Sequence, residues 1–157
     1  MSVTTHDSNE TLNGLIETCK DGQEGYRAAA EGAKSPDLKR LLNELSLERA
    51  QFAGDLQSEV TRLGGDPAKS GTTGGALHRG WLNIKKAVAG SSDHAILEEC
   101  ERAEDAAIHN YREALAKDMP SDLRSIIERQ YVQIQKDHHQ VRTLRDTGMA
   151  AAGQASI

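Results

Sequence analysis

Apolar residues recur every three or four positions along four long segments of the chain. This spacing places apolar side chains on one face of an α-helix, and no segment shows the sustained alternation that is typical of strands. Asp7 and Glu10 have the spacing of a capping box, so we expect the first helix to begin near Asp7. The pattern predicts an all-α protein. The first predicted helix runs from near residue 7 to near 34, and the second from 36 to 63. The third begins after residues 91–93, and a break at 118–120 separates it from the fourth, which extends to about 146.

The lengths of the connections predict how these helices are arranged. Helices joined by a few residues, as at Ser35 and near Met119, run antiparallel as neighbours. The segment 64–93 is much longer, and its part KSGTTGG is typical of a loop, whereas ALHRGWLNIKKAVA is typical of a short helix. Two antiparallel helical hairpins joined by a long crossover that carries a short helix form the ferritin-like four-helix bundle.

The domain organisation is expected to be simple. Residues 1–146 are predicted to form one ferritin-like domain, which agrees with the length of the chain. The last residues, 147–157, are small and weakly polar, and we expect them to form a flexible tail.

The composition narrows the functional classes. Aromatic residues make up 3% of the chain and the net charge is −5, so we expect an aliphatic core and no nucleic-acid partner, which would need a basic face. No apolar run approaches the ~20 residues that span a bilayer, and no secretory signal stands at the N-terminus, so we expect a cytoplasmic protein without a membrane partner. Cys19 and Cys100 lie on apolar stripes, which favours buried free thiols.

Three stretches resemble a known family in their order and spacing. They are GGALHRGWLNIK, ILEECERAEDAAIHNYREAL and ERQYVQIQKDHHQVRTLRD, and they resemble a bacterial family of small ferritin-like four-helix-bundle proteins of unknown function. The resemblance covers residues 10–146 and implies a ferritin-like fold. The wider superfamily contains ferritins, rubrerythrins and di-iron oxidases, but a fold does not by itself decide a function.

The ferritin-like superfamily suggests a test for metal ligands. A di-metal site takes a Glu from each of two helices and a Glu-x-x-His pair from each of the other two. Here Gln51 stands three residues after Glu48, and Gln135 stands three residues before His138, so neither pair is intact. Carboxylates and imidazole suit iron or manganese. The candidate ligands for iron or manganese are Glu24, Glu48, Glu101, Glu104 and His138.

The apolar stripe of the second helix carries a cation at its centre. Arg49 stands between Leu45 and Phe52, where an unpaired charge would be very costly. A guanidinium would oppose a metal ion but would pair well with a buried carboxylate. We therefore expect Arg49 to occupy the place where a relative holds metal. The predicted buried polar network consists of Gln23, Arg49, Glu101, Glu104 and His138, with Glu101 level with His138.

Two functions remain open at this point. The first is a non-catalytic structural or stress-associated protein, in which the stress association is implied by the resemblance alone. The second is a redox or iron-handling protein of the ferritin/rubrerythrin type that uses iron or manganese. A homo-oligomer is expected, with a dimer as the simplest form, and Leu41 and Leu47 lie off the main stripe where an interface could use them.

Overall fold

The computed structural model describes residues 4–71, 84 and 92–147. These residues form helices and no strand, so the all-α prediction is confirmed for the part of the chain that is described. The expected crossover helix, residues 76–89 with Trp81, lies outside the described residues apart from Ile84, as do residues 148–157 of the expected tail. The helices are α1 (Thr5–Gly32), α2 (Pro36–Arg62), α4 (Asp93–Leu115) and α5 (Ser121–Thr147).

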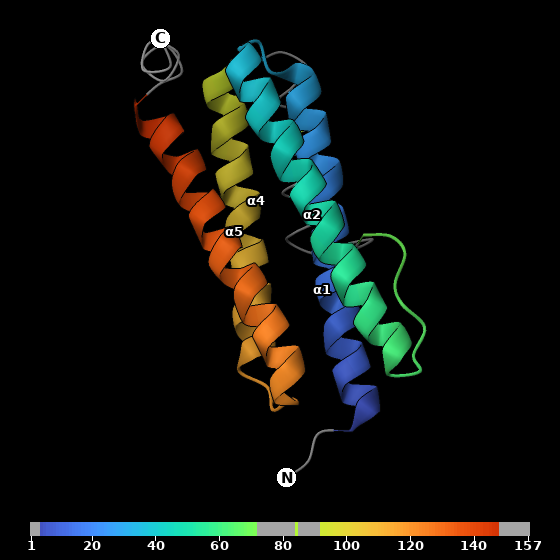
Figure 1. Cartoon of the computed structure of the whole chain (residues 1–157). Helices are drawn as coiled ribbons and strands as arrows, with labels where there is room; N and C mark the ends of the chain where they lie inside the picture. The colour runs from blue at the N-terminus through green and yellow to red at the C-terminus, as the bar shows by residue number, and fades with distance from the viewer. Residues whose placement is uncertain (1–3, 72–83, 85–91, 148–157) are drawn as a thin grey trace.

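The helices form two antiparallel hairpins. Figure 1 shows α1 and α2 running in opposite directions, and α4 and α5 likewise, while α4 runs parallel to α2. Each hairpin is packed closely, α1 also contacts α4, and α2 contacts α5 sparsely. This order and these directions are those of a ferritin-like four-helix bundle, as the connection lengths predicted.

Side-chain caps explain where the helices begin. Ser35 and Ser92 cap α2 and α4, and each hydroxyl accepts a hydrogen bond from the backbone N–H three residues later, that of Leu38 or Ala95. The first helix, α1, begins near Asp7 as expected, at Thr5, but Asp7 is not its cap. Its N-cap is Thr4, whose hydroxyl accepts from the backbone N–H of Asp7 at 3.1 Å. The hydroxyl of Thr4 therefore satisfies the backbone N–H of Asp7. If Asp7 itself were the cap, this N–H would lie outside the helix.

Asp93 joins the two hairpins at one end of the bundle. Its carboxylate oxygens accept hydrogen bonds from the backbone N–H groups of Lys34 and Ser35, at 2.8 and 3.0 Å. These N–H groups belong to the turn between α1 and α2, where no helical partner is available. The first residue of α4 thus holds the turn of the other hairpin.

Replacing Asp93 with alanine is expected to lower the free energy of unfolding by about 1–2 kcal/mol, because two backbone donors lose a charged acceptor. Urea denaturation followed by circular dichroism measures this loss. Asp55→Ala is the matched control, since Asp55 is an exposed carboxylate on the same bundle. Equal stability of the two variants would contradict the role of Asp93.

Hydrogen bonds hold the segment after α2, residues 64–71, against α1 and α2. Gly64 takes a left-handed conformation, with φ of 79°, which ends α2. The backbone of Ala68 then donates to Asn13 of α1 at 2.8 Å and accepts from Gln57 of α2 at 2.8 Å. Residues 64–71 therefore begin the crossover on the α1 side of α2.

The apolar core falls into two clusters. One cluster lies at the end of the bundle that holds the α1–α2 turn, and it includes Tyr26, Leu42, Leu97 and Val141, together with the crossover residue Ile84. The other lies at the opposite end and includes the residues Leu12, Leu56, Tyr111, Ile127 and Ile134. Both are built almost entirely from aliphatic side chains. In the described part of the chain, no helix is long and apolar enough to cross a membrane.

Candidate functional site

A layer of buried polar residues separates the two apolar clusters. Arg49 stands between Leu45 of one cluster and Ala53 of the other, and Asp137 stands between Ile134 and Val141. Glu104 takes the corresponding place on α4, so α2, α4 and α5 each contribute a charged side chain at this level. Buried charges of this kind are retained only when they find partners.

Arg49 is the centre of this layer. Its side chain is 1% exposed, and Nη2 donates to Oε1 of Glu104, which is 0% exposed, at 2.9 Å. The same nitrogen lies 3.8 Å from Oδ2 of Asp137. The guanidinium also lies over the ring of Tyr26, 5.3 Å from its centroid, where the negative face of the ring attracts a cation. Arg49 thus joins α1, α2, α4 and α5 through one permanent charge.

Glu48 extends the layer toward solvent. Burial raises the pKa of this half-buried carboxyl to about 8, and a hydrogen bond with the carboxyl group of Asp137 and the charge of Asp137 add to the effect, while Arg49 opposes it. A hydrogen bond between two carboxyl groups needs a proton on one of them, because ionised carboxylates only accept. Glu48 therefore holds a proton at neutral pH. Oδ1 of Asp137 accepts a hydrogen bond from the side-chain amide of Gln133 at 3.0 Å.

Acceptors outnumber donors in the layer. Burial raises the pKa of Glu104 well above its ordinary range, and the nearby Asp137 and Asp105 carboxylates add to it. Oε2 of Glu104 is buried without a hydrogen-bond partner among the described residues, as is Oε1 of Glu48. One guanidinium does not balance three carboxyl groups, so protons supply the remaining positive charge.

A second polar chain lies next to the layer, inside the neighbouring cluster. The hydroxyl of Tyr111 lies 3.1 Å from Sγ of Cys19 and donates to Oε1 of Gln130 at 2.8 Å. Gln130 in turn donates to the backbone oxygen of Phe52 at 3.3 Å. Burial raises the pKa of Cys19 to about 11 and that of Cys100 to about 12, so both thiols are protonated and unreactive at neutral pH.

Two of the predicted residues lie at the edge of the bundle interior and have other partners. Glu101 forms ion pairs with Arg142, at 3.2 Å, and with Arg145, both on α5. Nε2 of His138 lies 2.8 Å from Oδ1 of Asp105. The expected register, with Glu101 level with His138, is therefore one helical turn too short, because the reversal between α4 and α5 is centred beyond Met119.

The remaining predicted residues differ in their positions. Glu24 is exposed and pairs with Arg27 of the next turn at 2.7 Å, so the structure does not bring it to the layer. Gln23 is half-buried, and its backbone oxygen accepts from the hydroxyl of Ser46 at 2.8 Å. Its side-chain oxygen is buried with no partner among the described residues. Gln23 therefore lies near the layer without a hydrogen bond to Arg49.

Asp137 is the charged residue that the sequence pattern missed. The buried positions of α5 are spaced alternately by four and three residues: Leu123, Ile127, Gln130, Ile134, Asp137 and Val141. Alternating steps of this kind place Asp137 on the central stripe, with His138 beside it on the α4 side. The sequence interpretation put His138 on the stripe instead, although extending the heptad from Ile127 would have selected Asp137.

The residues of the layer do not fit the di-metal site of the ferritin-like superfamily. Arg49 places a permanent cation 2.9 Å from Glu104, where a metal would be held. Glu24 faces solvent, and Glu101 and His138 are held by other charged groups. Across residues 4–71, 84 and 92–147, no three His, Cys, Asp or Glu side chains are arranged to hold a metal ion. The donor set and the charge of the layer both argue against a metal pair here.

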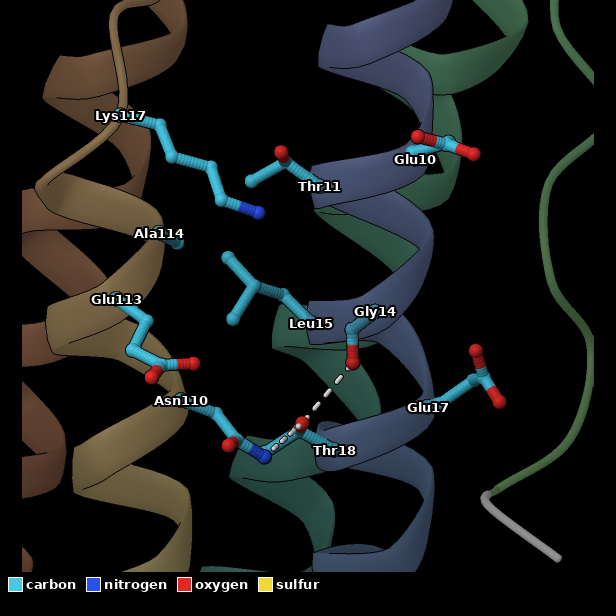
Figure 2. Close-up of a pocket in the computed structure, with 10 residues that line it drawn as sticks. All are labelled: Glu10, Thr11, Gly14, Leu15, Glu17, Thr18, Asn110, Glu113, Ala114 and Lys117. Carbon is cyan, nitrogen blue, oxygen red and sulfur yellow. Dashed lines mark hydrogen bonds between the residues drawn. The ribbon is translucent and has the colours of Figure 1, made fainter.

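A surface groove of about 300 Å³ lies between α1 and α4. Figure 2 shows Leu15 at its floor and the amine of Lys117 reaching toward Thr11. Thr18 donates to the backbone oxygen of Gly14 at 2.9 Å and accepts from Asn110 of α4 at 3.1 Å. These bonds tie α1 to α4, and none of the polar-layer residues lines the groove.

Comparison with known proteins supports the fold. The family described as "Domain of unknown function (DUF2383)" matches residues 7–117, more than half of the chain. The chain is also similar to a two-domain protein from Anabaena variabilis that contains DJ-1/ThiJ/PfpI-like and ferritin-like domains, with 18% identity and a TM-score of 0.77. That match covers 93% of this chain but 41% of the Anabaena chain, so this chain spans less than half of that protein. No curated protein matches the sequence.

Proposed function

We propose that this chain, which belongs to the family described as "Domain of unknown function (DUF2383)", is a non-catalytic ferritin-like bundle that acts as a structural or stress-associated interaction protein. In this proposal an ion network takes the place of the metal pair. The observation that carries it is the hydrogen bond between Arg49 and Glu104, both fully buried, at 2.9 Å. A guanidinium stays charged at all physiological pH values, so it competes permanently with a metal for the same carboxylates.

The role of the network in this proposal is to define how the helices fit together. A buried ion pair adds little net stability compared with apolar residues of similar size, but a single polar layer can fix helix register. Here the layer lies between two apolar clusters whose aliphatic residues could slide past one another by a turn. Arg49 opposes such a slide, because it would lose Glu104 and Asp137 together.

Metal analysis tests the proposal. The protein is purified without chelator, offered iron(II) and manganese(II) anaerobically, desalted and measured by mass spectrometry. We expect no ion retained at stoichiometric level, because Arg49 already neutralises Glu104. Retention of about one or two equivalents per chain, as a di-metal site would give, overturns the proposal if Glu104→Gln abolishes it. Glu24→Gln is the matched control, since Glu24 lies on the surface.

A further inference from the structure

The two hairpins contact each other unequally. α1 of the first hairpin packs against α4 of the second, whereas α2 and α5 have few backbone positions close together. Short turns join the helices within each hairpin, but residues 63–92 separate the end of α2 from the start of α4, so no short turn holds the hairpins together. The contact between α2 and α5 is therefore the weakest contact between neighbouring helices in the described part of the chain.

Hydrogen bonds fix the α1–α4 side of the bundle. The hydroxyl of Tyr111 on α4 lies 3.1 Å from Sγ of Cys19 on α1, and the side-chain amide of Asn110 donates to Thr18 at 3.1 Å. At the end of the bundle, Asp93 of α4 accepts from two backbone N–H groups of the turn between α1 and α2. The α1–α4 side therefore has the lasting contacts that an axis of rotation needs.

The facing sides of α2 and α5 are polar at mid-length. We call this contact the α2–α5 seam and define it by Glu48 and Phe52 of α2 and Gln130 and Asp137 of α5. Gln130 donates to the backbone oxygen of Phe52 at 3.3 Å, which is long for a hydrogen bond. Glu48 lies against Asp137 and is half-buried, so solvent reaches the edge of the seam.

Two arginines of α2 reach the second hairpin on this side. Arg62 pairs with Asp122 at 3.0 Å on the surface, where an ion pair adds little stability. Arg49 is buried, and its Nη2 donates to Glu104 of α4 at 2.9 Å and lies 3.8 Å from Asp137 of α5. Arg49 thus reaches from the first hairpin to both helices of the second, and it would lose both carboxylates if the hairpins moved apart.

We propose that the bundle opens along the α2–α5 seam, with the α1–α4 contact as the hinge and Arg49 as the latch. Each hairpin keeps its own helices and turn, and the second hairpin swings away from α2 as a unit, as in other hinge motions. Opening releases Arg49 from Glu104 and brings solvent to the polar layer. Because opening also exposes apolar side chains of both clusters, the closed form predominates and the open form is a minor state.

The proposal does not rest on the proposed function. Retained metal would overturn that function and would leave the unequal contacts between the hairpins unchanged. A bundle that never opens would, in turn, leave the buried pair of Arg49 and Glu104 as it is. The two proposals therefore fail in different experiments.

Distances between spin labels test the opening. Leu47 of α2, which is 71% exposed, and Lys136 of α5, which is also exposed, each precede a seam residue by one position. Leu47→Cys/Lys136→Cys therefore places labels across the seam. Glu10→Cys/Glu113→Cys places them across the hinge, since both residues line the groove between α1 and α4. The two native cysteines are buried and take no label in the folded chain.

The labelled chains are measured by electron paramagnetic resonance over a series of urea concentrations, with circular dichroism as the measure of helix content. We expect the seam distance to lengthen at a lower urea concentration than helix is lost, because the hairpins separate as folded units. The hinge distance should lengthen only as helix is lost. Seam and hinge distances that lengthen together with the loss of helix, as in all-or-none unfolding, would overturn the proposal.

A variant of Arg49 tests the latch. Arg49→Met removes the charge and should raise the open fraction of the seam at a given urea concentration at least about tenfold, as the loss of a charge-assisted hydrogen bond does. Arg27→Met is the matched control, since Arg27 pairs with Glu24 on the surface. An open fraction that is the same in both variants would overturn the role of Arg49. The two label pairs change nothing inside the bundle, so they decide the opening even if Arg49→Met does not fold.

Discussion

Replacing Arg49 with leucine is expected to lower the free energy of unfolding by about 3–5 kcal/mol, the loss typical when one partner of a buried ion pair is removed. The guanidinium is 1% exposed and holds Glu104, which is 0% exposed, at 2.9 Å. Without it, Glu104 and Asp137 remain buried beside each other with no cation between them. Urea denaturation monitored by circular dichroism at 222 nm gives the loss directly.

Two further variants show whether the loss comes from the buried pair. Arg27→Leu removes an exposed arginine from its pair with Glu24 and is expected to change stability by less than about 1 kcal/mol. The double variant Arg49→Leu/Glu104→Leu should recover part of the stability, because both polar partners are replaced by apolar groups. If Arg49→Leu were as stable as Arg27→Leu, the central role of Arg49 would be wrong.

Stability is expected to fall as pH rises from about 5 to 9, and Glu48→Gln is expected to reduce this fall by about 2 kcal/mol after allowance for solvent screening at a half-buried side chain. The folded state raises the pKa of Glu48 from 4.5 to about 8, chiefly by burial and by its hydrogen bond with Asp137. Between these values the folded state binds the proton more tightly than the unfolded state does. The stabilisation that Glu48 supplies by binding this proton is therefore complete below pH 4.5, and it is lost as the pH rises past 8.

Other charged groups of the layer also affect how the free energy of unfolding depends on pH. Asp137 and Arg49 face Glu48, and Glu104, whose pKa burial also raises, adds a loss of stability in the same direction. Urea unfolding of the native chain and of Glu48→Gln at pH 5, 7 and 9 isolates the part that Glu48 supplies. Glu24→Gln is the control and should follow the native curve. Parallel curves for the native chain and Glu48→Gln would mean that Glu48 is ionised in the fold.

The arrangement of the helices followed closely from the sequence. Each helix carries a strong three- and four-residue apolar period, and its ends are marked by local chemistry such as Ser35-Pro36 and Ser92. These signals act within one or two turns, so they can be read without knowing the neighbours. The connection lengths then left little choice of topology. The error at Asp7 was local as well, since Thr4 and Asp7 both fit a cap.

The candidate site was harder to predict because it depends on rotation and register between helices. The sequence spacing indicated that Arg49 is central. The reversal between α4 and α5 lies further along the chain than expected, and in the observed arrangement Asp137, rather than Glu101 or His138, faces Arg49. A change of about 100° in helix rotation, one residue in sequence, moves a side chain from the interior to the surface. Glu24 shows this directly, since it lies on the surface beside half-buried Gln23.

By itself, the sequence determined the all-α class, the two hairpins with their long connection, and the presence of a cation in an apolar stripe. All of these depend on periodicity and on local capping, which are properties of contiguous residues. Only the tertiary structure decided which carboxyl groups meet Arg49, that Glu48 lies against Asp137, and that Leu47 is exposed on the outside of α2. These depend on distances between residues of different helices, and small rotations of whole helices set those distances.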